Sequence, residues 1–227
     1  MPRSSDGIGR RPRTPRAVVF ALLVAIAAGL QGCASGGGQR PAGDRDPGDD
    51  RALSAADRSK ADRYFQEALA LMRDGRRDEA RALLRSLADA YPTLSGPLTN
   101  LGILEARGNQ QQIALQHFRE AVRTNPENAV AHNWLGILYR EQGDYARAEE
   151  AYRSAIALRP DYAIAYRNLG VLYDVYLERP EAALAAYRAY LERSPEDDLI
   201  VRVWVRELEA RGISAPPRSL AITGAGA

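Results

Sequence analysis

The sequence has few of the residues that build metal and redox sites. Among its 227 residues are one cysteine, Cys33, and two histidines, His117 and His132. A single cysteine excludes an internal disulfide and a cluster of metal-bound thiolates. The histidines stand in helical segments without paired ligand spacing. We therefore expect ordinary helix residues there, and neither a metal nor a cofactor.

Motifs of catalysis are missing as well. No serine stands in a nucleophile motif with a partner base, and the glycines at 36–38 follow no strand that could form a phosphate-binding loop. Glu149 and Glu150 beside Arg153 are expected on a solvated helix face. We predict that the chain is not an enzyme, and an enzyme or ligand-binding protein with an unrecognised site is the weakest alternative.

Helix-forming residue types are abundant. Alanine, leucine, glutamate and arginine dominate the middle of the chain, with few β-branched runs. Apolar residues make up 45% and charged residues 26%, which is typical of a globular protein. The composition predicts an all-α fold.

Residues 1–32 have the pattern of a cleaved export signal. Arginines precede the uncharged run from Ala17 to Leu30. Such a run spans only about 21 Å as a helix, against roughly 30 Å for a bilayer core, which favours a signal peptide over a tilted transmembrane anchor. Arg10-Arg11 suggests twin-arginine export, but Pro12 after them favours the general secretory route.

The end of the apolar run resembles the lipobox of bacterial lipoproteins. Leu30-Gln31-Gly32-Cys33 gives an aliphatic, a variable and a small residue, then cysteine. The resemblance implies cleavage before Cys33 and acylation of its thiol, which would anchor the chain to a membrane. An incidental free thiol is the alternative. Ala34, where an aspartate is absent, resembles the sorting pattern of outer-membrane lipoproteins that face the periplasm.

Loss of this leader changes the charge of the chain. Subtracting its five arginines and Asp6 from 31 basic and 29 acidic residues leaves a net charge of about −2. Basicity therefore gives no reason to expect a nucleic-acid partner. Residues 33–56 are rich in glycine, aspartate, arginine, proline and serine, which predicts a flexible linker.

An internal repeat of 34 to 35 residues follows the linker. Each unit has an alanine, a large apolar residue four positions later and a proline twelve positions after the alanine. The alanines are Ala80, Ala114, Ala148 and Ala183, and the prolines are Pro92, Pro126, Pro160 and Pro195. The spacing predicts repeats at about 61–94, 95–128, 129–162 and 163–197, in a domain spanning 57–211.

The third repeat, from Trp134-Leu135-Gly136 to Pro160, resembles the tetratricopeptide repeat (TPR) family. The resemblance implies antiparallel helix pairs stacked into a right-handed superhelical solenoid. We expect Gly136 to face Ala148 where the two helices approach. Gly143 should end the first helix and Asp144 should cap the second.

Both ends of the array depart from the pattern. The first repeat has Glu67-Ala68 where the others have Leu-Gly, and the fourth has one extra residue around 177–180, expected to alter its turn. Residues 198–211 predict a capping helix with Leu199, Val203, Val205 or Trp204, and Leu208 on its covering side. Residues 212–227 are expected to form a disordered tail.

In the TPR family, the first helices of successive repeats line a groove that holds peptides or partner helices. By register, the resemblance implies groove side chains at Phe65, Leu69, Thr99, Ile103, Asn133, Ile137, Arg140, Arg167 and Val171. Asn133 could bind a backbone amide, and Arg140 and Arg167 a carboxylate. Alternatively, the aliphatic residues pack between helices and Arg140 is simply solvated. The carboxylate clamp of some cytosolic members is not implied, because Asp62 and Phe65 differ from its lysine and asparagine.

The combined features predict a membrane-anchored scaffold or adaptor lipoprotein that binds protein partners in the periplasm. Its architecture is similar to that of TPR lipoproteins that assemble type IV pili and related secretion machinery. An adaptor that delivers substrates to a periplasmic protease or cell-wall enzyme is the alternative.

Overall fold

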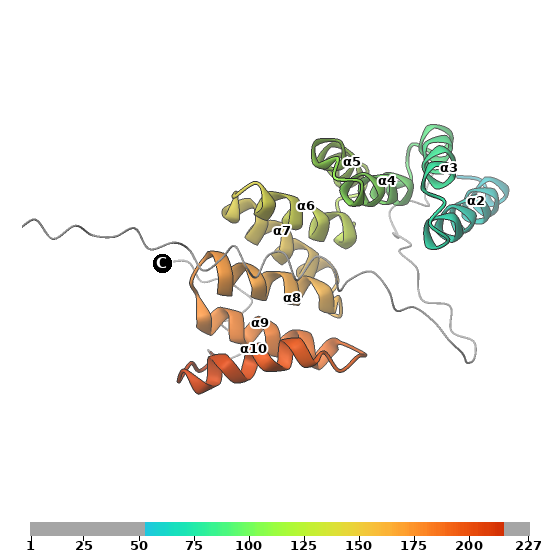
Figure 1. Ribbon diagram of the computed structural model, residues 1–227. Coiled ribbons are helices and arrows are strands. Elements are labelled where there is room, and N and C mark those ends of the chain that lie inside the picture. The colour runs from blue at the N-terminus through green and yellow to red at the C-terminus, as the bar shows by residue number, and fades with distance from the viewer. Residues whose placement is uncertain (1–52, 216–227) are drawn as a thin grey trace, which may run out of the picture. The chain divides into compact units, whose positions relative to one another are not determined.

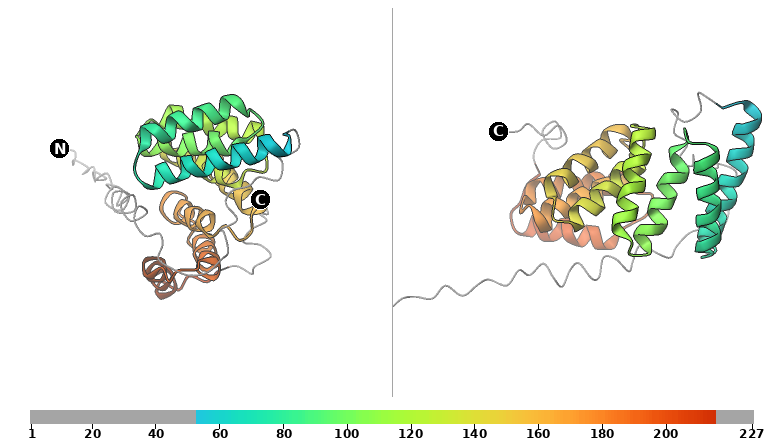
Figure 2. Two further views of the ribbon diagram at one scale, coloured as in Figure 1. Left: turned by 90° about the vertical axis from the view of Figure 1, so that its right-hand side faces the viewer. Right: turned by 90° about the horizontal axis from the view of Figure 1, so that it is seen from above.

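The computed structural model describes residues 53–215, and every regular element within them is helical (Figure 1). The helices are α2 (Ala55–Arg73), α3 (Arg77–Ala90), α4 (Ser95–Arg107), α5 (Gln111–Thr124), α6 (Ala129–Glu141), α7 (Tyr145–Leu158), α8 (Ala163–Val171), α9 (Pro180–Arg193) and α10 (Leu199–Ala210), with a π-helical segment, η1 (Leu172–Tyr176), after α8. Neighbours in sequence pack on one another along the array (Figures 1 and 2).

The helices form the four predicted pairs, each closed by a tight turn. We call α2, α4, α6 and α8 the first helices, and α3, α5, α7 and α9 the second helices. Gly75 after α2 and Gly143 after α6 have φ angles of 75° and 78°. Asn109, in the equivalent turn after α4, has a φ angle of 60°. The Asp144 side chain accepts a hydrogen bond from the Arg147 backbone N–H and caps α7. The predicted roles of Gly143 and Asp144 are confirmed.

The close approach within the second, third and fourth pairs is between a glycine and an aromatic ring. A Cβ atom on Gly136 would lie 2.6 Å from ring carbons of Tyr152, which is fully buried. Gly102 meets Phe118 and Gly170 meets Tyr187 in the same way. The atoms nearest to Gly136 belong to the ring of Tyr152, one turn further along α7 than Ala148, so this ring makes the closest approach to the glycine.

The extra residue of the fourth repeat is absorbed within a helix. Residues Leu172–Tyr176 form one π-helical turn, which holds one more residue than an α-helical turn. The helix pair α8 and α9 remains intact on either side of it. We expected this residue to alter the turn at 177–180; the structure places the change earlier, although Glu178 there has a φ of 52°.

The first helix begins slightly earlier than predicted. The Ser54 side chain accepts a hydrogen bond from the Asp57 backbone N–H, and α2 starts at Ala55. Residues 55 and 56, predicted as the end of the linker, are therefore helical. The fully buried Ala68 stands at the small-residue position that glycine occupies in the later repeats.

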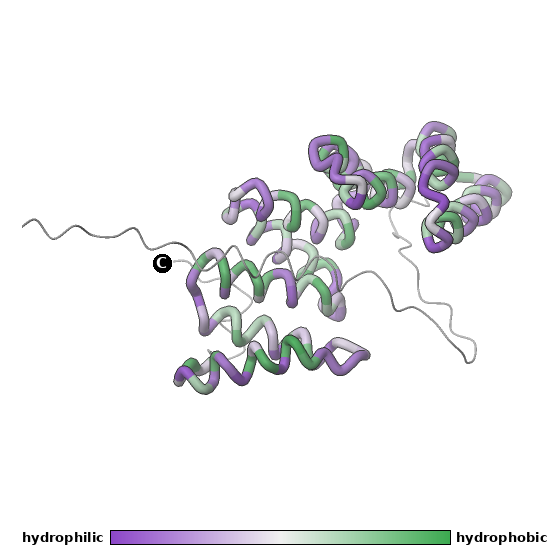
Figure 3. Tube along the Cα trace, viewed as in Figure 1, coloured by the Kyte–Doolittle hydropathy of each residue, from purple (hydrophilic) through white to green (hydrophobic). Residues whose placement is uncertain are grey.

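The capping helix α10 repeats the register of the first helices. Its N-cap Asp198 corresponds to Asn128, so Val205 and Leu208 match the buried Leu135 and Leu138 of α6. Hydrophobic and hydrophilic residues alternate along α10 in Figure 3. Counting from the N-cap puts Arg206 at the position of Gly136.

The buried side of α10 differs from the prediction. Val201, Val205 and Leu208 are buried against the fourth repeat, whereas Leu199 is 68% and Val203 is 58% exposed. The prediction that Leu199 and Val203 lie on the covering side was therefore wrong. Each is two positions from a buried valine, and residues two positions apart on a helix lie on different faces. Leu199 and Val203 occupy the face opposite to the core.

No helix among residues 53–215 has the length and apolar content needed to cross a bilayer. The predicted signal peptide 1–32, Cys33, the linker up to residue 52 and residues 216–227 of the predicted tail lie outside the described residues.

Candidate protein-binding surface

The residues predicted to line the groove fall on equivalent positions of the first helices. We call this set the first-helix surface: Phe65, Leu69, Thr99, Ile103, Asn133, Ile137, Arg140, Arg167 and Val171. Because each first helix follows its N-cap at the same register, one position recurs as Thr99, Asn133 and Arg167. The structure gives these residues different roles.

Thr99 is buried in a polar contact between the second and third repeats. Its hydroxyl donates to the Ser95 carbonyl at 2.9 Å and accepts from the Asn128 side-chain amide at 2.8 Å. Asn128 also donates to the Ser95 hydroxyl at 2.9 Å and caps α6 by accepting from the Ala131 backbone N–H. The hydrogen bonds of Thr99 thus join α4 to the start of α6.

Asn133 makes the equivalent contact between the third and fourth repeats. It is 2% exposed, and its side-chain oxygen accepts a hydrogen bond from the Asn168 amide at 2.9 Å. An amide held in this way stabilises the junction of α6 and α8. A ligand could reach its side chain only by displacing that contact.

Arg167 faces the capping helix. Its Nε lies 3.7 Å from an Asp198 carboxylate oxygen, and its guanidinium carbon lies 5.7 Å from the centre of the Trp204 ring. The Nε atom is buried and has no hydrogen-bond partner within the described part of the chain. Arg167 is therefore held by charge and by an aromatic face, with donor capacity left over.

The aliphatic residues of the first-helix surface are partly exposed. Ile137 and Val171 pack against the core of the third and fourth repeats, and Ile103 packs against that of the second and third. Phe65 covers Gly96 of the next repeat, where an added Cβ would lie 3.2 Å from its ring, and Leu69 is also partly exposed. These side chains both pack between helices and present an apolar surface.

Arg140 ends the same row on α6. Its guanidinium carbon lies 5.8 Å from the centre of the Tyr176 ring, and its Nε is buried without a hydrogen-bond partner among residues 53–215. Within that range, no carboxylate lies within ion-pair distance of it, in contrast to Arg153, which lies 3.2 Å from Glu149. Glu149 was expected on a solvated face, but it is largely buried and also accepts from the Tyr173 hydroxyl.

Two tyrosine hydroxyls of the second helices reach this neighbourhood, which the sequence reasoning did not include. The Tyr187 hydroxyl donates to Asp174 at 3.3 Å, whereas the buried Tyr152 hydroxyl has no partner in the described residues. The sequence held one signal for them, since the aromatic position is Phe118 in the second repeat and tyrosine in the next two. Burial raises the pKa of both tyrosines and also that of the Asp174 carboxyl.

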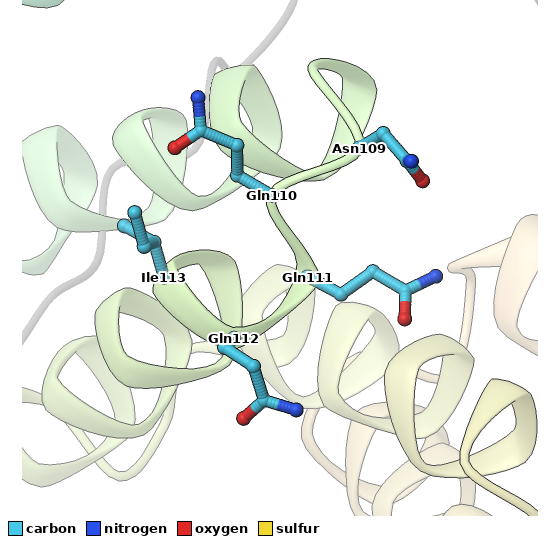
Figure 4. A pocket seen from close by; sticks show the side chains of 5 residues that line it. All are labelled: Asn109, Gln110, Gln111, Gln112 and Ile113. Carbon is cyan, nitrogen blue, oxygen red and sulfur yellow. The ribbon is translucent and has the colours of Figure 1, made fainter.

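A hollow lies at the turn between α4 and α5. It is lined by Asn109, Gln110, Gln111, Gln112 and Ile113, whose side chains are drawn in Figure 4. Gln111 donates to a Glu141 carboxylate oxygen at 3.0 Å. With only amides and one aliphatic side chain, the hollow provides no group for acid–base or nucleophilic chemistry.

The histidines have ordinary surroundings. His132 Nε2 lies 3.0 Å from the Pro126 carbonyl oxygen, and burial lowers the pKa of His117. Among residues 53–215, no three His, Cys, Asp or Glu side chains gather in a way that could hold a metal ion.

Comparison with known proteins identifies the repeats. Two family models, both described as tetratricopeptide repeat, match the chain, one at residues 64–93 and the other at 99–163 and again at 135–198. The type IV pilus assembly protein PilF of Pseudomonas aeruginosa is 30% identical over 129 residues, which are 56% of this chain and 47% of that protein. The photosystem I assembly protein Ycf3 of Rippkaea orientalis is 30% identical over 92 residues, 38% of this chain and 51% of its own. The chain thus spans about half the length of these relatives.

Solved structures show the same fold. The structure of Pseudomonas aeruginosa PilF matches with a TM-score of 0.62 at 21% identity, covering 69% of this chain and 71% of that one. A thermophilic TPR protein of Thermus thermophilus matches with a TM-score of 0.54 at 25% identity, covering 66% and 81%. Both support a right-handed solenoid of helix pairs.

Members of this family bind other proteins, and the named relatives are assembly proteins. The helix pairs, the glycine–aromatic contacts and the family models, which together match more than half of the sequence, lead to one assignment: the chain belongs to the tetratricopeptide repeat family.

Proposed function

We propose that this protein is a lipid-anchored scaffold of the bacterial cell envelope, which uses its first-helix surface to hold protein partners during assembly of a pilus or secretion complex. The observation that carries the proposal is the surface at Ile137, Arg140 and Val171. There, partly exposed aliphatic side chains lie beside an arginine without an acidic partner in the described residues. Such a mixture suits a peptide or helix from another protein.

The anchor and the location rest on the sequence. The short apolar run and the Leu30–Cys33 motif support acylation of Cys33, and Ala34 supports the outer membrane. The assembly role is supported by the likeness to the type IV pilus assembly protein.

Fractionation of cells tests the anchor. The Cys33→Ala variant should leave the membrane fraction, whereas Gln31→Ala, which keeps the cysteine, should remain there. Membrane association of the Cys33→Ala variant after a high-salt wash would contradict the anchor.

Site-specific photo-crosslinking in intact cells tests the surface. A crosslinking residue at Ile137 should capture a partner, whereas one at Ile113, exposed on α5, serves as the control. Capture from Ile113 but not from Ile137 would move the binding site off the first-helix surface. Recovery of a pilus or secretion component supports the assembly role, whereas recovery of a protease or cell-wall enzyme favours the adaptor function.

A further inference from the structure

The side of α10 that faces away from the core is an apolar surface at the end of the helix array (Figure 1). Leu199, Ile200 and Val203 are each more than half exposed, and they are the three most exposed large apolar side chains among residues 53–215. Apolar residues scattered singly over a surface are normal, whereas a group of them indicates a contact site. We call these three residues the outer face of α10.

The outer face occupies the position through which the earlier first helices contact the next repeat. Counting from the N-caps, Val203 corresponds to Thr99, Asn133 and Arg167. Each of those three side chains bonds or pairs with the next helix in this series or with its N-cap residue. The described part of the chain contains no helix after α10. The surface that would carry a further repeat is therefore apolar and uncovered there.

The C-terminal segment leaves α10 on the other side. Ile213 and Ala215 pack against the core that the buried side of α10 also joins. Leu220 and Ile222 are the only large apolar residues of the segment that follows, 216–227. A segment that starts on the buried side with two such residues matches the outer face less well than a helix from a second molecule does.

The charges flanking the outer face suit an antiparallel copy of the same helix. Intervals of three, four and three positions, typical of residues that face a partner helix, separate Glu196, Leu199, Val203 and Arg206. Neither Glu196 nor Arg206 has an ion pair within residues 53–215. When two copies cross between Leu199 and Val203, each Leu199 lies opposite the other copy's Val203. The same crossing point places each Glu196 opposite the other copy's Arg206.

We propose that two copies of this protein associate through the outer faces of α10, packed antiparallel about a two-fold axis. Leu199, Ile200 and Val203 form the apolar centre, and two reciprocal ion pairs flank it. An ordinary separation of about 8–10 Å between helix axes leaves room for Arg206. Three side chains from each copy bury far less than the roughly 1,200 Å² of a stable interface, so the dimer should dissociate on dilution. This contact is independent of the anchor and of the partner surface proposed above.

Disulfide formation in intact cells tests the pairing. Two tagged copies of the full chain are made together, one with Leu199→Cys and the other with Val203→Cys, and a mild oxidant is added. The mixed disulfide should form at least fivefold more than in cells whose two copies carry Ile113→Cys, a change at an exposed residue of α5. Cys33 is present in both experiments and affects them equally. Equal yields would overturn the proposal.

Photo-crosslinking at Val203 identifies whatever covers the outer face. This chain should be the protein that is captured. Capture of a different protein instead would show that a partner occupies the face. A mixed disulfide that appears only after deletion of residues 216–227 would show that the C-terminal segment occupies it. Either of these two results would overturn the proposal.

Exchange of the flanking charges tests the antiparallel arrangement. Glu196→Arg or Arg206→Glu alone places like charges opposite one another and should lower the yield of the mixed disulfide about threefold. The double variant exchanges both charges and should restore the yield. Within one chain the two residues are ten positions apart, about 15 Å along a helix, so they cannot pair with each other. A double variant as poor as the single ones would refute the arrangement.

Sedimentation of the full-length protein in detergent separates association from folding. The mass of the unchanged protein should rise with concentration, and Val203→Glu should weaken this association at least tenfold. Because Val203 is exposed, the variant should unfold at the same temperature as the unchanged protein in dilute solution. Unweakened association, or a fall of several degrees in the unfolding temperature, would contradict a role of Val203 in pairing.

Discussion

The ring of Tyr152 on α7 lies directly against Gly136 on α6, at a distance that leaves no room for a Cβ atom. The contact fixes how closely the two helices of the third repeat approach. Because Gly102 with Phe118 and Gly170 with Tyr187 repeat it, the same spacing recurs in three successive pairs.

Replacing Gly136 with alanine should destabilise the fold by about 1–3 kcal/mol, because the new methyl group overlaps the buried ring. Urea unfolding followed by circular dichroism measures the loss. The Gly136→Ala, Tyr152→Leu double variant should lose less stability than the sum of the losses in the two single variants. The reason is that leucine, which is smaller than tyrosine, makes room for the new methyl group. Strict additivity would show that the steric contact is not the cause.

Removing the Asn128 side chain should cost about 2 kcal/mol, because it caps α6 and also bonds the buried Ser95 and Thr99. Urea unfolding of Asn128→Ala provides the value. Asp144→Ala is the matched control, since Asp144 caps α7 with local partners only, and its loss should be smaller. A larger loss for Asp144→Ala would mean that the contact between repeats adds little.

Replacing Asp174 with asparagine should leave the unfolding temperature unchanged or raise it at neutral pH. Burial raises the pKa of Asp174 against the opposing effects of Arg211 and of the hydrogen bond from Tyr187, and Glu207 raises it further. A carboxyl with a raised folded-state pKa is unfavourable when ionised, and this penalty disappears as pH falls through that pKa.

The difference between Asp174→Asn and the unchanged protein should therefore shrink in acid. Calorimetric scans at neutral pH and at several mildly acidic values measure it. A lower unfolding temperature for the variant at neutral pH would contradict the sign of this argument.

Replacing Asn133 with alanine should reduce stability by about 1 kcal/mol, because the Asn168 amide loses its acceptor. If Asn133 acts only between repeats, the Asn133→Ala, Asn168→Ala double variant should be little worse than either single variant. Additive losses would show that the two amides act independently.

The repeats could be predicted from the sequence, because the small and aromatic residues that form the contacts within the helix pairs recur at a regular spacing. It was weaker for contacts between repeats. Thr99 and Asn133 stand at positions that line grooves by analogy, but their partners, Asn128 and Asn168, lie 29 and 35 residues away and follow no motif. Counting positions could not show that these side chains were already bonded.

The π-helical turn at Leu172–Tyr176 shows a related limit. An inserted residue is visible in the spacing of the prolines, yet whether a helix or a turn absorbs it depends on packing. Here Leu172 and Tyr173 are buried in that turn, which holds the extra residue within the helix.

Arg206 sets a limit on how the array can grow. Each helix pair needs a residue without a bulky side chain at the position of Gly136, and α10 has arginine there in otherwise the same register. A further helix could not approach α10 as closely as α7 approaches α6, whatever segment supplied it. An added repeat would therefore pack more closely if inserted before α10 than if attached after it.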